Sequence, residues 1–580
     1  MHRLLKLKTQ SPGDYAYWSL GFLFLVAMHY FQLHPAGSSL TLSFNSSVWI
    51  VLSFTIGFGL YKIVSESQWV YTNLTLGLLV AVTLLLIPTF YPASIDPLNI
   101  GRLYGLLAGL LVFVVLQQMA LHDRRKELLL FLLLCAVWIE ALLGWSQEYI
   151  VGPGNFMGHR EGYPPFGVFS QRNVMASFMA TGLVLSGYLL SRFQEFSNRR
   201  FYQSVCLLTP LLTVPLILML NSRTGWIGAL VGSLLMLFYL QSKVGTRQTI
   251  AWMLMIVLGI FTGFLLLNYG DGAGLSAALS RVQSDPIRER MYYQALLLVL
   301  ENPLIGVGLG NFEVEFNSFA AALNAAGISA PNGEPNLNHP HNELLFWGVE
   351  GGIAPLLGML LAAFLVLRCV FRLDNATRFA MLGLLFPIVF HTQTEYPFYH
   401  SVVHWVVFIL IIYLIDSLAN EKKTRQLKST LLVGTAAIVI PLFTTLFMVT
   451  TLQAGAILTQ YERDPSTSVE TLLDIRNPIV WRDRIQLKIR TDLMYQGLAR
   501  NDFSQVQPYI DLVSGIVESK PRWQYFQNLI MAHDFIGQSE LADARAIEAR
   551  YRFPDQNFYR LQDGNFTLIS VDVDMDLEQE

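Results

Sequence analysis

The chain has 580 residues, of which 53% are hydrophobic, 14% are charged and 13% are aromatic. Because a typical soluble domain carries about 25% charged residues, this composition excludes a single soluble globule. The net charge of −3 is not that of a basic nucleic-acid-binding protein. The three cysteines, Cys135, Cys206 and Cys369, lie within apolar runs, which excludes a disulfide framework and a cysteine-based zinc site.

Thirteen apolar runs are candidates for membrane-spanning helices, since a span needs about 20 mostly apolar residues. In chain order they are 15–33, 48–64, 70–91, 103–121, 128–146, 170–190, 205–221, 225–240, 250–268, 344–367, 379–396, 401–418 and 430–451. The first run has no small-residue cleavage site after it, so we expect a retained helix rather than a signal peptide. The expected fold class is therefore all-α, a polytopic bundle of about thirteen spans.

Lysine and arginine residues are distributed unevenly between the two sets of loops. Eighteen of them lie in the N-terminal segment and in loops near 122–127, 191–204, 241–249, 368–378 and 419–428, whereas the short loops of the other set carry four. Positively charged loops stay in the cytoplasm, so we expect a cytoplasmic N-terminus. An odd number of spans then places the C-terminus on the outer side.

Two polar parts of the chain are expected on that outer side. Residues 269–343 form a long loop within the transmembrane part, 1–451, and long loops of this kind are usually functional or disordered. Residues 452–580 have the composition of a soluble domain, with amphipathic helical patterns at 478–497, 502–519 and 538–551. Such helix pairs resemble a short solenoid, so we expect a helical, solenoid-like C-terminal domain.

Polar and ionisable residues gather at the outer ends of the spans. They include His159 and Arg160, Gln171, Arg172 and Asn173, Asn221, Ser222 and Arg223, Arg281, Arg288 and Arg290, His339, His341, Asn342 and Glu343, and His391, Glu395, Tyr396 and His400. A transporter is expected to bury such groups at the midplane between broken helices. Only Glu140 lies well within a span. The distribution therefore indicates a site at the outer face.

The His339–Glu343 segment has two interpretations. Histidine and glutamate at close spacing suit zinc. However, His339 and His341 are two residues apart and do not share a helical face, and no third ligand is identifiable by spacing. We therefore predict no metal and no cofactor.

The segment 288–312 could bind phosphate in two ways. Arg288 and Tyr292 are four residues apart and share a helical face. The glycines that follow, Gly306, Gly308 and Gly310, resemble a phosphate cradle, but they follow a helix and fit neither the dinucleotide nor the P-loop spacing. We favour a tight backbone turn that docks the loop on the membrane domain, and the arginines as the better phosphate ligands.

With these segments, the chain resembles the O-antigen ligase superfamily, and within it the bacterial O-linked protein oligosaccharyltransferases of the PglL/PilO type. Four segments carry the resemblance in order: Gln171-x-Asn173, the Ser222-Arg223 turn, the helix from Arg288 with the Pro-x-x-Gly-x-Gly that follows it, and His341-Asn342. The turn Glu395-Tyr396-Pro397 is similar to an acidic-Tyr-Pro turn of the protein-transferring branch. Arg172 departs from that branch, which often has proline there.

The resemblance implies a GT-C-like fold and a glycosyltransferase of the inner membrane. The implied reaction moves an oligosaccharide en bloc from an undecaprenyl-diphosphate carrier to a Ser or Thr hydroxyl of a periplasmic protein such as a pilin. Transfer to lipid A core, as by an O-antigen ligase, and glycan polymerisation are alternatives with the same donor. A transporter or flippase is the non-enzymatic alternative.

The resemblance also implies roles for particular residues. Arg288 and Arg223 would bind the diphosphate, with Arg172 and Arg290 in reserve. His341 would be the general base, because an imidazole with a pKa of about 6.5 accepts a proton at neutral pH. Five further residues complete the expected site. Gln171 and Tyr396 would orient acceptor or sugar, and His339, Asn342 and Glu395 would help to bind the substrate.

Overall fold

A computed structural model describes residues 11–95, 100–119, 121–151, 157, 163–268, 287–331, 337–562 and 565–569. The chain folds into two compact units. Unit 1 comprises Met1–Leu86, Gly101–Asp285 and Leu357–Val480, and unit 2 comprises Ile87–Ile100, Pro286–Leu356 and Trp481–Glu580. Segments that are far apart in the sequence therefore share each unit.

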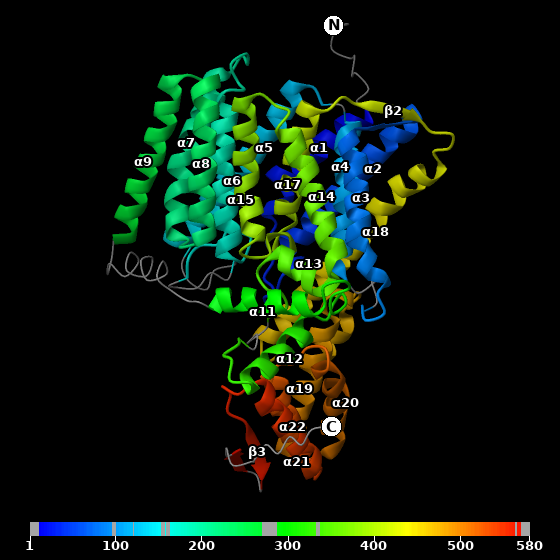
Figure 1. Cartoon of the computed structure of the whole chain (residues 1–580). Coiled ribbons are helices and arrows are strands. Elements are labelled where there is room, and N and C mark those ends of the chain that lie inside the picture. Colours follow the sequence, from blue (N-terminus) through cyan, green and yellow to red (C-terminus); the bar gives the residue numbers. More distant parts are fainter. Residues whose placement is uncertain are drawn as a thin grey trace. The chain divides into compact units, whose positions relative to one another are not determined.

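Unit 1 is built from long helices that run alongside one another and from shorter helices between them (Figure 1). They are α1 (Pro12–Leu25), η1 (Ala27–His29), η2 (Ser39–Thr41), α2 (Ser43–Glu66), α3 (Asn73–Leu86), α4 (Gly101–Gln118), α5 (Asp123–Tyr149), α6 (Arg172–Leu190), α7 (Arg199–Met219), α8 (Arg223–Lys243), α9 (Thr246–Asn268), α14 (Ile353–Val370), which begins in unit 2, α15 (Asn375–Thr392), α16 (Pro397–His400), α17 (Val402–Ala419), α18 (Leu431–Arg463), η5 (Val469–Asp474) and η6 (Ile479–Trp481), where the unit ends.

Every apolar run of the sequence is occupied by helix, and the all-α, polytopic fold class is confirmed. Within the described part of the chain, eleven helices are long and apolar enough to cross a membrane. Two of the thirteen expected spans are not among them. One is α1, which has only 14 residues, and the other is α15, whose first turn is polar.

The expected span 344–367 is divided into two helices. The first is α13 (Glu343–Gly351), and α14 follows it. Gly352 lies between them with a φ of +65°, a conformation that residues with a Cβ rarely adopt. A Cβ at Gly352 would lie 2.5 Å from the backbone of Leu304. The break thus depends on a glycine that lets the chain turn against another segment of unit 2.

The helix α6 lies at the centre of a closely packed group with α8 and α15. A Cβ at Gly225 of α8 would lie 2.5 Å from the Cβ of Ala176, and one at Gly232 would lie 2.6 Å from Val184. Small residues at such positions let helix backbones approach one another in a membrane protein. Seventeen of the residues of α6, from Val174 to Leu190, are buried. The start of α6 is therefore held in a fixed place.

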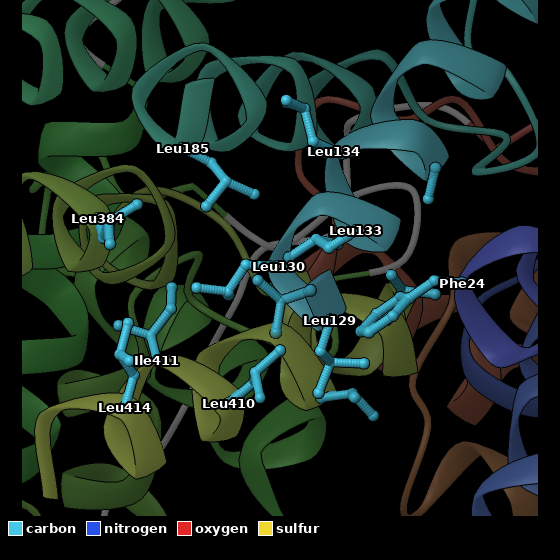
Figure 2. Packing of buried hydrophobic residues seen from close by; sticks show 14 of the residues in the cluster. Phe24, Leu129, Leu130, Leu133, Leu134, Leu185, Leu384, Leu410, Ile411 and Leu414 are labelled. Atoms are coloured by element: carbon cyan, nitrogen blue, oxygen red, sulfur yellow. The ribbon is translucent and has the colours of Figure 1, made fainter. Parts of the chain in front are cut away.

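The core of unit 1 is formed by aliphatic side chains from several helices (Figure 2). Leucines of α5, among them Leu129 and Leu130, lie near Phe24 of α1 and near Leu410 and Leu414 of α17. All of these side chains are nearly inaccessible to solvent. Their packing fixes α5, whose polar residues contact the turn before α6.

The helix α17 also carries a buried acid, Asp416. Its carboxylate accepts hydrogen bonds from Thr72 Oγ1 at 2.8 Å, Gln117 Nε2 at 2.8 Å and Asn420 Nδ2 at 2.9 Å. Close to it, β1 (Gln68–Tyr71) pairs with β2 (Lys423–Gln426) in a short antiparallel ribbon. The acid is thus satisfied within the fold, as a buried charge must be.

Unit 2 combines a loop region with the C-terminal helices. Its elements are η3 (Ile87–Phe90), α11 (Ile287–Glu301), α12 (Phe312–Ala325), α13, α19 (Arg482–Arg500), α20 (Phe503–Val517), α21 (Trp523–Phe535), α22 (Ser539–Arg552), β3 (Tyr559–Gln562) and β4 (Asn565–Leu568). The three helices expected in the tail are present, and α21 is a fourth that the pattern missed. Their core includes Tyr509, Phe526 and Phe553.

Polar contacts join the C-terminal helices to α12 within unit 2. Arg522 Nε donates to Glu313 Oε1 at 3.0 Å. Arg552 Nη1 donates to Asn317 Oδ1 at 3.1 Å and to Ser318 Oγ at 2.9 Å. Residues 481–569 and the 287–356 segment therefore belong to one compact unit. The division at residue 451 into a transmembrane and a periplasmic domain stays a prediction.

Candidate active site

The turn that leads into α6 is held by two polar residues of α5. Gln147 Oε1 accepts from the backbone N–H groups of Phe166 at 3.0 Å and Gly167 at 2.9 Å, and its Nε2 donates to the carbonyl of Gly167 at 3.1 Å. Glu140 Oε2 accepts from Val168 N at 3.1 Å. Glu140 and Gln147 are seven residues apart and share a face of α5. This turn ends at Gln171.

The predicted Gln171-Arg172-Asn173 segment forms the first turn of α6. Gln171 is the N-cap residue, but its side chain caps no backbone N–H. The Oε1 atom of Gln171 is shielded from solvent and accepts no hydrogen bond from the residues that the structure describes. Buried polar atoms without a partner are rare and call for an explanation. Arg172 is half-buried in the same turn.

Asn173 contacts the turn after α15. Its Nδ2 donates to Glu395 Oε1 at 3.0 Å, and Glu395 is almost fully buried. A second contact lies four residues after Asn173 and four residues before Glu395: Ser177 Oγ lies 2.7 Å from His391 Nδ1. The residue pairs 173/177 and 391/395 each have a spacing of four, so the two contacts follow one another along the α6–α15 interface.

The second contact extends to α17. His404 Nε2 lies 2.9 Å from Ser177 Oγ, and His404 Nδ1 lies 3.0 Å from Ser401 Oγ. His391, His404 and Ser177 are all buried. These histidines therefore have hydrogen-bonding partners inside unit 1, which fits a role in holding α6, α15 and α17 together.

Tyr396 follows Glu395 and lies outside the long helices. Its ring stacks on the His400 ring with a centroid distance of 4.6 Å. Burial, and to a lesser degree the neighbouring Glu395 carboxylate, raises the pKa of Tyr396 to about 12. The phenol therefore stays protonated near neutral pH and can donate a hydrogen bond.

Arg223 is an exposed residue at the start of α8. The preceding Ser222 caps this helix, since its Oγ accepts from Gly225 N at 3.3 Å. The following Thr224 has its Oγ1 2.8 Å from Thr394 Oγ1, in the same turn that carries Glu395. The Ser-Arg turn, the start of α6 and the Glu395 turn, all predicted site segments, are therefore brought together in unit 1.

A second group of predicted residues lies in unit 2, on α11 and in the loop before α13. Tyr292 OH donates to the carbonyl of His341 at 3.1 Å. Arg288 precedes Tyr292 by four residues and lies on the same face of α11. The helix that carries Arg288 thus contacts the loop that carries His341.

The loop around His341 is held by its neighbours. His341 has a φ of +55°, and its backbone N–H donates to His339 Nδ1 at 2.8 Å. Because Nδ1 of His339 accepts this bond, its proton belongs on Nε2, which lies 3.5 Å from Glu343 Oε2. Asn342 Oδ1 accepts from Leu345 N at 3.0 Å and caps α13. These contacts hold the backbone of the loop, and the His341 side chain is half-buried.

The glycine-rich segment 306–310 is a tight turn, as the favoured interpretation predicted, and it packs on α13 of the same unit; its docking on the membrane domain stays a prediction. The backbone N–H of Val307 donates to the carbonyl of Val349 at 2.8 Å, and that of Gly308 donates to the carbonyl of Glu350 at 3.0 Å. All three glycines have positive φ, between +64° and +91°. The N–H groups of Val307 and Gly308 are thus used within the fold and do not form a phosphate cradle.

Arg290 is separated from Arg288 by its position on α11. Residues two apart on an α-helix lie about 200° apart around its axis, so the two arginines point to different sides. Arg290 Nη1 donates to Ser329 Oγ at 3.2 Å. Arg290 also lines a cavity of about 570 Å³ together with Arg550 and Tyr551. The geometry therefore does not support Arg290 as a reserve for Arg288. His159, Arg160 and Arg281 lie outside the described residues.

The sequence interpretation missed several polar partners of the site. His34 Nε2 lies 3.1 Å from Ser170 Oγ, just before Gln171, and His29 Nδ1 lies 2.6 Å from Glu140 Oε1. His29 lies within the first apolar run and His34 directly follows it, and nothing in their local sequence indicates their partners. The structural role of Tyr292 was also missed. Among the residues that the structure describes, no group of three or more His, Cys, Asp or Glu side chains is arranged to hold a metal ion.

Three family models match successive parts of the chain. Residues 165–190 match the model described as protein glycosylation ligase, residues 208–363 match O-antigen ligase, and residues 379–564 match the C-terminal part of a virulence factor membrane-bound polymerase. No curated protein matches the chain. The matches describe a multi-pass membrane enzyme that transfers a lipid-linked glycan to a protein or lipid. The chain belongs to the O-antigen ligase superfamily, as a member of the type that includes the protein glycosylation ligases.

Proposed function

We propose that the protein transfers an oligosaccharide en bloc from undecaprenyl diphosphate to a Ser or Thr hydroxyl of a periplasmic protein such as a pilin. The contact between Asn173 and Glu395 carries this proposal. Asn173 lies in the segment that matches the protein glycosylation ligase model, and Glu395 begins the acidic-Tyr-Pro turn that resembles the protein-transferring branch.

In this proposal the protein lies in the bacterial inner membrane with a cytoplasmic N-terminus. The excess of lysine and arginine in one set of loops supports this orientation. The loops that carry the candidate residues are then expected on the periplasmic side, as is the domain 452–580. Nucleotide sugars are not available in that compartment, which is why a donor attached to a lipid is expected.

Arg288 and Arg223 are the proposed ligands of the donor diphosphate. Each is at most half-buried, and a guanidinium group stays protonated and can bind phosphate oxygens in a bidentate manner. Arg172, in the first turn of α6, is a third candidate for this role. As the diphosphate leaves, its negative charge is stabilised by these cations rather than by a proton from an acid.

His341 accepts the proton of the acceptor hydroxyl. The hydroxyl oxygen attacks the anomeric carbon while the bond from this carbon to the diphosphate oxygen breaks, and the configuration is inverted. The proton passes to the imidazole of His341, and undecaprenyl diphosphate leaves. His339 and Asn342 support this step by holding the loop, through the backbone N–H of His341 and the start of α13.

Gln171 and Tyr396 orient the reacting groups. The Oε1 atom of Gln171 accepts no bond from the described part of the chain, so it is suited to accept one from a sugar or acceptor hydroxyl. The phenol of Tyr396, whose pKa is raised to about 12, is suited to donate one. Glu395 accepts a hydrogen bond from Asn173, so the segments that carry Gln171 and Tyr396 are joined at this point.

A glycan polymerase is the second candidate, because residues 379–564 match the polymerase model. An experiment with purified components separates the candidates. The protein is mixed with a lipid-linked oligosaccharide and a pilin, and the masses of all products are measured. A mass increment of one oligosaccharide on the pilin is expected. Lengthened lipid-linked glycan would favour the polymerase, and a product only on added lipid A core would favour the O-antigen ligase activity.

A further inference from the structure

The buried pair His29 and Glu140 is the strongest unexplained feature of unit 1. The carboxyl of Glu140 is inaccessible to solvent, and the His29 side chain is only 10% exposed. Their atoms Nδ1 and Oε1 lie 2.6 Å apart. An acid within an apolar helix is costly unless it has a partner, and such a residue usually has a specific role.

The partners of His29 determine how many protons the pair holds. Its Nε2 lies 2.9 Å from the carbonyl oxygen of Phe24, which can only accept a hydrogen bond. Nε2 must therefore carry a proton. Nδ1 either carries a second proton and faces a carboxylate, or accepts one from a protonated Glu140. In both cases the pair has one shared proton and no net charge.

The other oxygen of Glu140 holds the turn that leads to Gln171. Its Oε2 accepts from Val168 N at 3.1 Å. Gly167, with a φ of +58°, lies so close that a Cβ there would collide with Oε2. Only Phe169 and Ser170 lie between the bonded Val168 and Gln171, the N-cap of α6. The carboxyl of Glu140 thus connects His29 to the segment that carries a candidate site residue.

We propose that His29 and Glu140 are positioning residues that share one proton and hold the 166–171 turn so that Gln171 is correctly placed. This inference rests on the function proposed for Gln171. The shared proton lets the pair hold the turn without an unpaired charge in the membrane domain. A transporter would instead use Glu140 to carry a proton or an ion, and would need the carboxyl itself.

Substitutions that keep or remove the hydrogen bonds test this proposal. In Glu140→Gln, the amide nitrogen can donate to Nδ1 of a neutral His29, and the amide oxygen can accept from Val168 N. In Glu140→Ala, both partners lose their bonds. Glu148→Ala, on the exposed end of the same helix, is the matched control.

Hydrogen exchange at the Val168 amide measures the contact directly and requires no activity. Glu140→Ala should raise the exchange rate roughly 10- to 100-fold, as expected for the loss of a hydrogen bond to a charged group. Glu140→Gln and Glu148→Ala should leave it unchanged. Unchanged exchange in Glu140→Ala, or the same increase in Glu140→Gln, would overturn the proposal.

The shared proton has its own test. His29→Ala leaves the buried carboxyl without its partner, whereas the double variant His29→Ala/Glu140→Gln leaves only a neutral amide. His29→Ala should lower the melting temperature and raise the Val168 exchange rate. The double variant should show smaller changes in both quantities. Equal changes in melting temperature and exchange rate in the two variants would contradict the proposal that the pair shares a proton.

A transfer assay then separates this inference from the proposed function. Glu140→Ala should lower kcat about tenfold or more and leave KM for the lipid-linked donor nearly unchanged, because Arg288 and Arg223, the main proposed diphosphate ligands, lie on other helices, α11 and α8. Glu140→Gln should transfer at the wild-type rate; loss of transfer in this variant would count against the inference. If the wild type transfers nothing while the exchange results hold, the proposed function fails and the positioning pair stands.

Discussion

Asn173 and Glu395 are separated by 222 positions in the chain, yet Asn173 Nδ2 donates a 3.0 Å hydrogen bond to Glu395 Oε1. The bond joins the start of α6 to the turn after α15. Glu395 is buried, so its carboxyl needs such a donor. The contact thus joins the two segments that carry Gln171 and Tyr396, the residues that we propose to orient the reacting groups.

Substitutions at this contact should affect transfer according to whether the bond can still form. Asn173→Ala should lower the transfer rate roughly 10- to 100-fold, since hydrogen bonds to charged groups contribute about 1.5–3 kcal/mol. Glu395→Gln should retain most activity, because its amide oxygen can still accept from Asn173. The rates are measured with purified protein, lipid-linked donor and pilin. Equal loss in both variants would mean that the charge of Glu395, rather than the bond, is required.

Removal of the imidazole of His341 should lower the transfer rate by about 10²- to 10⁴-fold, the usual contribution of a general base. Donor binding should change little, because the proposed phosphate ligands remain. His122→Ala is the control, as this histidine caps α5 and has no role in the proposed site. Normal transfer by His341→Ala, at the donor and acceptor concentrations used for the wild-type protein, would show that another group takes the proton.

Loss of Arg288 or Arg223 should weaken the binding of the donor and slow the departure of the diphosphate. Each alanine variant should lose activity, and each lysine variant should recover only part of it, because an ammonium group cannot form the bidentate contact. Arg500→Ala, at the exposed end of α19, serves as the control. Kinetics over a range of donor concentrations measure both effects. Full activity in Arg288→Ala and Arg223→Ala would place the diphosphate elsewhere.

The glycine turn gives a prediction about stability. A Cβ at Gly306 would collide with the backbone of Val349 and Glu350, whereas Gly327, also at positive φ, has nothing within 4 Å. Gly327→Ala should therefore cost only the conformational penalty of about 1–2 kcal/mol. Gly306→Ala should cost an additional amount of about 1–3 kcal/mol from overpacking. Thermal unfolding of both variants in detergent gives the comparison, and equal losses would contradict the packing of this turn on α13.

Tyr396 should contribute to the dependence of stability on pH in alkaline solution. Because burial raises its pKa in the folded protein to about 12, above the ordinary value near 10, the folded state holds this proton when the unfolded state has lost it. The contribution of Tyr396 is thus constant below pH 10 and is lost as pH rises from about 10 to 12. In Tyr396→Phe, the free energy of unfolding should fall less steeply with pH over this range. Parallel pH curves for the two proteins would show that the phenol is not buried.

Much of the helical architecture could be predicted because apolar length is a local property of the sequence. All thirteen apolar runs are occupied by helix, although the run 344–367 is divided at Gly352 and two runs fall short of the length or apolarity of a span. The break was missed because a glycine within an apolar run looks the same whether the helix continues or turns. The tail helices were found by their amphipathic pattern, except α21.

The candidate site was predicted as a set of segments. Within these segments, some side chains are bonded to other described parts of the fold and others are not. Gln171 Oε1 accepts no hydrogen bond from the described residues, whereas Asn342 caps a helix and Glu395 accepts a hydrogen bond from Asn173. Arg290 was grouped with Arg288 because the two are close in sequence. Helix geometry separates them, since two positions correspond to about 200° around the axis.

The sequence by itself determined the class of the protein, the order of its helices and the segments that carry its polar chemistry, because hydrophobicity and motif spacing depend on neighbouring residues. Only the tertiary structure decided which of these groups meet: Asn173 with Glu395, His29 with Glu140, and the C-terminal helices with α12. A hydrogen bond requires two atoms within about 3 Å. For residues more than a hundred positions apart, that distance is set by the packing of whole helices and not by any local pattern.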